Sequence, residues 1–231
     1  MARITKISKS TYKDQVIAFI YDTVLKGKLS PGERIWETWL SEQLKISRAP
    51  IREALRQLAQ NGLVEYRPQV GNFIASLSSK QIYDAYVTRG LLEGFAASYA
   101  AQSFSQNDLA KLDKLVNKMF EAAQQKQHYP LANVDNQFHE IIFSKCQNAQ
   151  LIAFAKNLTL LLHLIFCKHW TKVYRPEQVR TRHQEIVNEL RGGDPRAIES
   201  CIRSHYLETG NMMTMFGSDV LPPSSGKADR L

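Results

Sequence analysis

The chain has 231 residues, of which 44% are hydrophobic, so it is long enough to bury one or two cores. No apolar run approaches the roughly 18 residues of a membrane helix, and the first residues lack a signal-peptide apolar region, so we expect a cytoplasmic protein with no membrane partner. The three cysteines, Cys146, Cys167 and Cys201, are widely spaced and odd in number, which argues against a disulfide framework or a thiolate metal site.

The first quarter of the chain predicts three helices in succession. Residues 11–26 repeat apolar side chains at four-residue steps and stop at Gly27, as a helix with one buried face does. Residues 36–44 form a shorter helical pattern, and only two residues separate it from a third helix over 47–60. Two helices joined by so short a turn predict a helix-turn-helix.

The third of these helices carries two different stripes. Ser47 is a good N-cap, and Pro50 is tolerated only in a first turn. Apolar side chains recur at helical spacing on one face, and arginines recur at steps of four on another. The apolar set is Ile51, Ala54, Leu55 and Leu58, and the arginine set is Arg48, Arg52 and Arg56. Taken alone, such an arginine stripe is usually a solvated surface.

A hairpin and a basic excess accompany this helix. Residues 63–67 alternate in polarity, Gly71 supplies a tight turn and residues 73–75 return, which predicts a hairpin or wing. The net charge of +8 is uneven, because residues 1–78 carry +5 and the remaining 153 residues carry +3. A basic excess on a helix-turn-helix favours DNA as its partner.

Four segments of this region resemble the winged helix of GntR-superfamily transcription regulators. They are Pro31-Gly32-Glu33-Arg34-Ile35, Leu40-Ser41-Glu42-Gln43-Leu44, the stretch from Ser47 to Leu55, and Gly62-Leu63-Val64. The resemblance implies that helix 47–60 enters a major groove of double-stranded DNA and that the wing tip approaches a minor groove. The residues that it assigns to DNA binding are Arg34, Ser47, Arg48, Ala49, Arg52, Gln69 and Gly71. The tip reads Gln-Val-Gly instead of the family's common Asn-Arg-Gly, so it offers no minor-groove arginine.

Beyond residue 77 the sequence changes to long helical patterns without strand signals. These patterns cover residues 80–102, 106–127, 131–146, 149–172, 176–191 and 195–216. We therefore expect a mainly α protein, with a winged helix-turn-helix domain over 1–77 and an antiparallel bundle of six or seven helices over 78–216. The tail 217–231 is rich in Ser, Pro and Gly and is expected to be disordered.

One aspartate and three histidines of the bundle form a candidate metal site. Asp135 and His139 stand four apart, so on a helix their Cβ atoms lie about 5 to 6 Å apart on one face. His183 and His205 lie roughly 12 Å before and 15 Å after a turn at residues 192–195, so their imidazoles can meet at one level. An isolated Asp/His pair is more often structural than metal-binding, but two further histidines at matched height favour a site for one ion.

The same residues resemble the metal-binding branch of the FCD effector domain of the FadR subfamily. The matching positions are Asp84, Arg89, Glu93, Asp135, Phe138, His139, His183, Ile186, Asp194 and His205. In that branch an aspartate and three histidines hold a divalent ion whose open positions take a carboxylate or water. The resemblance therefore implies a small organic acid as effector. Arg89 could clamp its carboxylate, although an ion pair with Glu93 on the same helix is equally consistent.

A donor set of one carboxylate and three imidazoles suits zinc or nickel, with manganese, cobalt or iron less favoured. The remaining histidines lack a comparable register, and we interpret them as structural or exposed: His128, His163 and His169. His163 lies on an apolar helix and could line the effector cavity.

The combined pattern predicts a transcription regulator, a repressor, whose helical domain senses an organic acid. Because one recognition helix reads too few base pairs, we expect a homodimer on a palindromic operator. One alternative is a metal-dependent hydrolase tethered to DNA, and another is a purely structural dimerisation domain. No local motif offers a general base beside the metal, so we expect no enzymatic activity.

Overall fold

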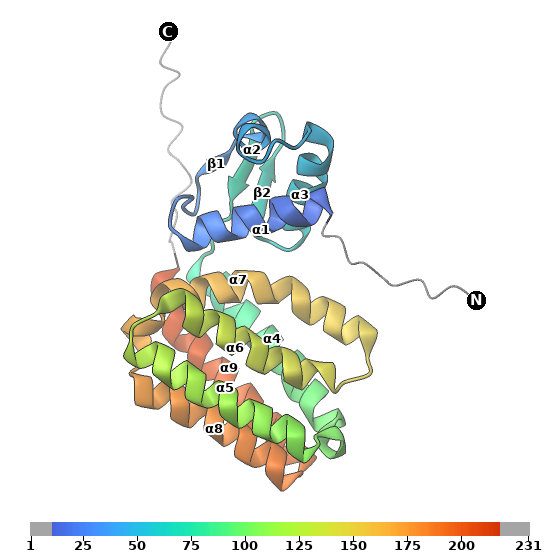
Figure 1. Cartoon of the computed structure of the whole chain (residues 1–231), viewed down its shortest axis with the longest axis vertical. Helices are drawn as coiled ribbons and strands as arrows, with labels where there is room; N and C mark the ends of the chain where they lie inside the picture. Colours follow the sequence, from blue (N-terminus) through green and yellow to red (C-terminus); the bar gives the residue numbers. More distant parts are fainter. Residues whose placement is uncertain (1–10, 218–231) are drawn as a thin grey trace, which may run out of the picture. The chain divides into compact units, whose positions relative to one another are not determined.

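The computed structural model describes residues 11–217, apart from the side chains of residues 157 and 159–161. It divides into two compact units between Ala75 and Ser76 (Figure 1). The predicted disordered tail, 217–231, lies outside the described residues except for Gly217.

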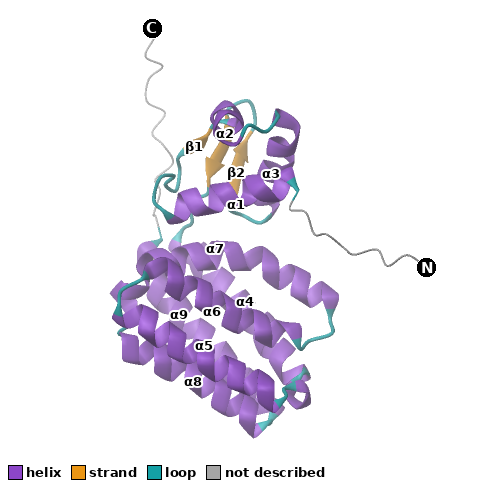
Figure 2. Ribbon diagram, viewed as in Figure 1, coloured by secondary structure: helices purple, strands orange, loops and turns teal. Residues whose placement is uncertain are grey.

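The N-terminal unit is a helix-turn-helix with a small sheet (Figure 2). Its elements are α1 (Tyr12–Leu25), β1 (Arg34–Ile35), α2 (Glu37–Leu44), α3 (Arg48–Gln60), β2 (Val64–Arg67) and β3 (Gly71–Ile74). The strands pair antiparallel in the order β1-β3-β2, with β2 and β3 forming the predicted wing. The winged helix-turn-helix is therefore confirmed. Strand β1 was missed, since two residues carry no periodic signal.

Local chemistry explains where these elements start and turn. Thr11 caps α1 in a capping box with Asp14, which satisfies two backbone donors at the helix start. Lys45 has a φ of 56° in the turn between α2 and α3, which lets the chain reverse within three residues. The apolar stripe of α3 is buried with side chains of the other two helices. This core includes Val16, Ile20, Leu40, Ile51, Ala54, Leu55 and Leu58.

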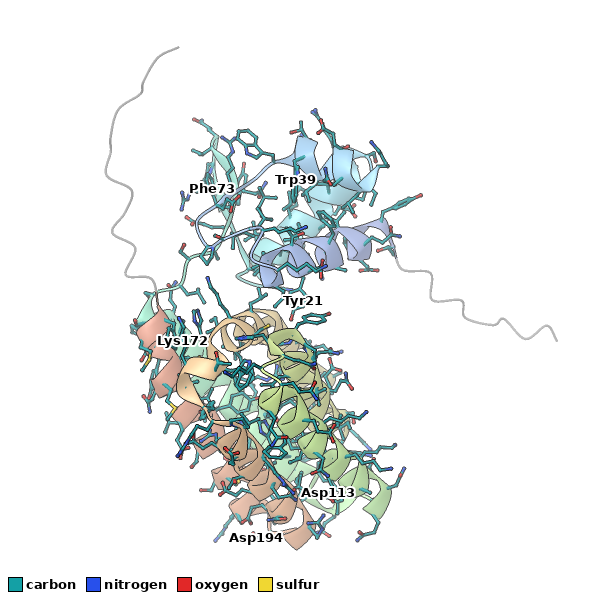
Figure 3. The ribbon with its side chains drawn as sticks, turned by 60° about the vertical axis from the view of Figure 1, so that its left-hand side comes forward. Tyr21, Trp39, Phe73, Asp113, Lys172 and Asp194 are labelled. Atoms are coloured by element: carbon teal, nitrogen blue, oxygen red, sulfur yellow. The ribbon has the colours of Figure 1, made fainter. Side chains whose placement is uncertain are left out.

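The C-terminal unit is entirely helical in its described residues, as predicted. Its α-helices are α4 (Ser79–Tyr99), α5 (Gln106–Gln124), α6 (His128–Ser144), α7 (Ala149–Val173), α8 (Pro176–Gly192) and α9 (Pro195–Met213). Two short 3₁₀ helices, η1 (Ala101–Ser103) and η2 (Thr214–Phe216), follow α4 and α9. Figure 3 shows Asp194 at the end of this unit where α8 turns into α9, and Lys172 near the opposite end. Among the described residues, no helix is long and apolar enough to cross a membrane.

Two predicted helix boundaries were wrong for identifiable reasons. Helix α6 begins at His128, three residues before the expected start, because Pro130 lies within its first turn, where its missing N–H costs no helical bond. Helix α5 ends at Gln124 because Lys126 adopts a left-handed φ of 54°, which a helix cannot continue through.

Glycines allow α4 and α9 to pack closely against each other. A Cβ atom at Gly90 would lie 2.8 Å from the Cβ of Tyr206, and one at Gly210 would lie 2.8 Å from the Cβ of Tyr86. Each tyrosine thus covers a glycine of the opposite helix. This packing fixes Tyr86 and Tyr206 beside the histidines of the bundle.

Candidate functional site

The structure brings together the four residues of the predicted metal site. The candidate ligand nitrogens of His139 on α6, His183 on α8 and His205 on α9 all lie within 4.8 Å of one another. Asp135, one turn before His139, places Oδ1 at 3.0 Å from Nε2 of His183 and 3.9 Å from Nε2 of His139. Three helices therefore converge on one point, which we call the histidine cluster: Asp135, His139, His183 and His205.

The hydrogen bonds of this cluster fit a bound cation. Nδ1 of His183 donates to the carbonyl of Val179 at 2.7 Å, so Nε2 of a neutral ring presents a lone pair to the Asp135 carboxylate. Two acceptors 3.0 Å apart need a proton or a cation between them, and two neighbouring ligands of one ion are about 3 Å apart. Nδ1 of His205 is buried and has no hydrogen-bond partner among the described residues. A divalent ion would satisfy the two acceptors of His183 and Asp135, and His205 has a ring nitrogen within 4.8 Å of the other histidine nitrogens.

Glu93 on α4 supports the cluster from behind. Its side chain is fully buried, and Oε1 accepts a hydrogen bond of 2.5 Å from Nδ1 of His139. Its other oxygen accepts a hydrogen bond of 2.7 Å from the Tyr206 hydroxyl. A carboxylate in this position fixes the imidazole tautomer so that Nε2 faces the site. Sequence reasoning missed this role, although a carboxylate on the buried face of α4 was a signal that it needed a partner.

Arg89 lies beside Glu93 on α4, and we call these two charged residues the buried polar layer. Its Nη1 donates to the carbonyl of Ala155 at 2.6 Å, and its Nε lies 3.5 Å from Glu93 Oε2. The guanidinium also stacks 4.5 Å from the ring centroid of Phe143. The ion pair with Glu93, weighed above as the alternative, is therefore formed. Arg89 also lines the cavity beside the cluster, and its contact with an effector stays a prediction.

Burial and neighbouring charges set the protonation of the cluster. Burial, followed by the nearby His183 and Arg182, lowers the pKa of His205 well below its usual value, so this ring is neutral. Burial raises the pKa of Asp135, but His183, His139 and Arg89 outweigh it, so the carboxyl is ionised. Burial lowers the pKa of His139, but Glu93 and Asp135 outweigh it, and the net shift is upward. A proton on His139 therefore competes with a metal ion.

A cavity of about 50 Å³ adjoins the histidine cluster. Its apolar wall is formed by Leu162, Phe166 and Val179, and its polar wall includes Tyr86 and Arg182. Arg182 donates to the carbonyl of His205 at 2.7 Å and also pairs with Glu208.

The other histidines take different places. His163 lines the cavity, as the sequence had suggested. Nδ1 of His128 lies 2.8 Å from the carbonyl of Cys167, and His169 stacks on Phe216 with ring centroids 4.2 Å apart.

In the N-terminal unit, the predicted DNA-binding residues of α3 are exposed. Arg48 and Ala49 begin the helix, and Arg52 follows one turn later with its Nε 2.9 Å from Glu37 Oε2 on α2. Ser47 has the backbone conformation of an N-cap, but its side chain makes no capping hydrogen bond. Its hydroxyl is therefore available to a ligand.

The remaining predicted DNA-binding residues lie on or beside the wing. The guanidinium of Arg34 crosses Gly71, since its Nε and Nη2 would lie 3.2 Å from a Cβ at that position. Arg34 also stacks over Trp36, with its Cζ 3.8 Å from the ring centroid. Gly71 has a φ of 131° and Gln69 a φ of 62°, so both form the tight tip of the β2–β3 hairpin. The structure thus brings Arg34 to the wing.

Comparison with known proteins gives two family matches. Residues 12–74 match the bacterial regulatory proteins of the gntR family, and residues 84–208 match the FCD domain. The chain is 28% identical over 200 residues to a protein named the probable D-xylose utilization operon transcriptional repressor of Paenarthrobacter nicotinovorans, covering 87% of this chain and 88% of that protein. It is 26% identical to the HTH-type transcriptional repressor RspR of Escherichia coli K12, covering 84% and 85% of the two chains. In fold, it is similar to E. coli McbR/YncC, with a TM-score of 0.75, 20% identity, and coverage of 90% and 99%.

Proposed function

Because the chain belongs to the GntR family of DNA-binding transcription regulators and carries an FCD domain, we propose that it is a repressor controlled through the histidine cluster. In this proposal Asp135, His139, His183 and His205 hold one divalent ion. A small organic acid then binds in the adjoining cavity and changes the affinity for the operator. The observation that carries the proposal is the convergence of three histidines and an ionised aspartate beside one cavity.

The charges around the cavity favour an anionic ligand. Asp135 and Glu93 against Arg89 leave one net negative charge, and the pair of Arg182 and Glu208 adds none. A divalent ion would turn this into one net positive charge in a buried site, where uncompensated charge is costly. One carboxylate would neutralise it.

The donor set indicates what the ion would contribute. One carboxylate and three imidazoles suit zinc or nickel, and manganese, cobalt or iron are possible. When bound, the ion supplies a Lewis-acid position for an oxygen of the acid. The chain itself orients His139 through Glu93 and lines the cavity with the apolar side chains of Leu162 and Phe166.

The hydrolase alternative has less support. A metal-dependent hydrolase needs a general base that reaches the attacking water. Glu93 is a poor base, because His139 occupies one of its oxygens and Tyr206 occupies the other. Asp135 is a candidate ligand. The arrangement therefore favours binding over turnover.

On the DNA side, we propose that α3 enters the major groove with Arg48 and Arg52 at base edges or phosphates. Arg34 would then support a backbone contact, and the wing tip at Gln69 and Gly71 would approach the minor groove. The support is the exposure of these arginines on a helix whose opposite face is buried.

We also propose a homodimer on a palindromic operator. Helix α4 exposes an apolar stripe in the C-terminal unit, with Leu91, Phe95 and Tyr99 exposed by 45%, 49% and 71%. Such a stripe is typical of an interaction surface, and a two-fold dimer presents two recognition helices. Light scattering should give the dimer mass at micromolar concentration and the monomer mass for Phe95→Glu. A monomeric native protein would contradict the proposal.

The metal-dependent regulation of operator binding is tested with the variant His183→Ala. The comparison variant is His128→Ala. His128 lies outside the cavity lining, so that variant should keep its metal and its response. His183→Ala should lose bound metal in elemental analysis. It should also lose any effect of acid on operator affinity in fluorescence anisotropy, while DNA binding without acid persists. Full metal occupancy in His183→Ala would refute this role of the cluster.

A further inference from the structure

Tyr86 lines the effector cavity, and its buried hydroxyl has no hydrogen-bond partner among the described residues. The residue is 3% exposed, and its hydroxyl makes no hydrogen bond with any described residue. Buried hydroxyls are normally paired, since an unpaired one costs free energy of folding. An unpaired group beside a candidate binding site therefore requires an explanation.

The position of this hydroxyl is fixed by the packing of α4 against α9. Tyr86 covers Gly210, and its ring centroid lies 6.4 Å from that of Tyr206. Because only 3% of the residue is exposed, the ring has no open solvent into which it could turn. The hydroxyl is thus held in place although nothing in the chain uses it.

Other tyrosine hydroxyls at the cavity do have partners. The Tyr174 hydroxyl lies 2.9 Å from Oγ1 of Thr209, and the Tyr206 hydroxyl donates to Glu93 at 2.7 Å. The contrast marks Tyr86 as a donor available to a molecule inside the cavity.

The size of the cavity limits that molecule. A volume of about 50 Å³ corresponds to about three to five water-sized groups. Because bonded atoms lie closer together than neighbouring waters, this space suits an acid of about four to six non-hydrogen atoms, such as acetate or lactate. Leu162, Phe166 and Val179 line the apolar side of this space.

We propose that Tyr86 is a specificity-determining residue of the effector site, whose hydroxyl donates a hydrogen bond to an oxygen of a short carboxylic acid held beside the histidine cluster. This inference rests on the proposed function, since the acid is the proposed effector. It adds the residue that recognises the acid and a limit on its chain length.

The test compares the zinc-loaded native protein with Tyr86→Phe, which removes only the hydroxyl. Tyr83→Phe is the matched control, because Tyr83 lies on the same helix but outside the cavity lining. Acetate, lactate and octanoate are titrated against each protein by calorimetry. Zinc content and melting temperature without acid are measured in parallel.

Tyr86→Phe should keep its zinc and bind acetate or lactate about tenfold to a hundredfold more weakly, the loss expected for a hydrogen bond to a charged group. Its melting temperature without acid should rise by a few degrees, about 2 to 5 °C, because the unpaired hydroxyl is gone. A purely structural tyrosine would lose stability instead. Tyr83→Phe should bind the acids as the native protein does.

Each contrary result has a separate meaning. If Tyr86→Phe binds both short acids with native affinity, the role of Tyr86 is wrong while the effector site survives. If octanoate binds the native protein as tightly as lactate does, the size limit is wrong. If no acid binds the zinc-loaded native protein, the proposed function itself fails.

Discussion

The two units of this protein place their polar residues in opposite environments. In the N-terminal unit the arginines of α3 stand in solvent, and Arg52 is 57% exposed even while paired with Glu37. In the C-terminal unit Arg89 and Glu93 are 4% and 0% exposed. Charged groups in water can change partners at little cost, whereas buried ones hold a single arrangement. The exposed surface therefore suits a replaceable partner such as DNA, and the buried layer suits a fixed geometry around a ligand.

The variant with the largest expected effect on stability is Glu93→Ala. Removing Glu93 takes away the carboxylate that pairs with the buried guanidinium of Arg89, which should destabilise the C-terminal unit by about 3 to 5 kcal/mol. It also frees the His139 ring, so zinc affinity should fall about 10- to 100-fold. Urea unfolding followed by circular dichroism measures the first effect, and competition with a zinc indicator measures the second.

Glu140→Ala is the control, because Glu140 is an exposed carboxylate on α6 next to His139. Its stability and zinc affinity should stay near native. If Glu93→Ala were equally mild, the buried layer would not be the rigid part of the protein.

A second test concerns the close packing of helix α4 against helix α9 in the C-terminal unit. Gly90→Ala places a Cβ at 2.8 Å from Tyr206, so it should cost about 1 to 3 kcal/mol of stability. Gly192→Ala is the matched control, since a Cβ there meets no atom within 4 Å, and it should be neutral or stabilising by up to about 1 kcal/mol. Thermal unfolding of the two variants compares them directly. Equal melting temperatures would show that α4 and α9 can adjust.

The corresponding test of the exposed surface is Arg52→Ala. If Arg52 contacts a guanine, operator binding should weaken by about 1 to 3 kcal/mol and become less selective at one position of each half-site. Stability should change by less than about 1 kcal/mol, because the pair with Glu37 is exposed. Fluorescence anisotropy with an operator selected from random duplexes measures the binding. Arg203→Ala, an exposed arginine of α9, should leave it unchanged.

The smallest expected effect concerns Asp108 and Lys145, a charged pair that is less exposed than Arg52 and less buried than Arg89 and Glu93. Hydrogen bonds from Lys145 and Ser105 lower the pKa of Asp108 to about 2. Because the folded pKa is depressed, the stabilisation is present above the unfolded value of about 3.9 and is lost as pH falls toward 2. Asp108→Asn should cost about 1 kcal/mol at pH 6, because solvent still reaches the pair, whose Lys145 and Asp108 side chains are 24% and 12% exposed. Melting curves of the variant and the native protein should converge near pH 2, and a constant difference would contradict this assignment.

Sequence by itself determined the features that depend on local spacing. The apolar stripe of α3 and the four-residue step from Asp135 to His139 follow from helical periodicity. The fold class also followed, because strand patterns disappear beyond the wing. His183 and His205 lie at similar distances along their helices from the turn at residues 192–195, and this spacing correctly predicted that their rings are neighbours.

Only the tertiary structure decided which partners the buried polar groups take. Glu93 meets His139 across 46 residues of chain and Tyr206 across 113, and no local pattern encodes either contact. Spacing also left the partner of Arg89 open, whereas packing pairs it with Glu93 and the carbonyl of Ala155. The unpaired hydroxyl of Tyr86 exists because glycines let α4 and α9 approach and hold the ring in place. Periodicity selects the face of a helix, but the atoms opposite that face depend on how all the helices pack together.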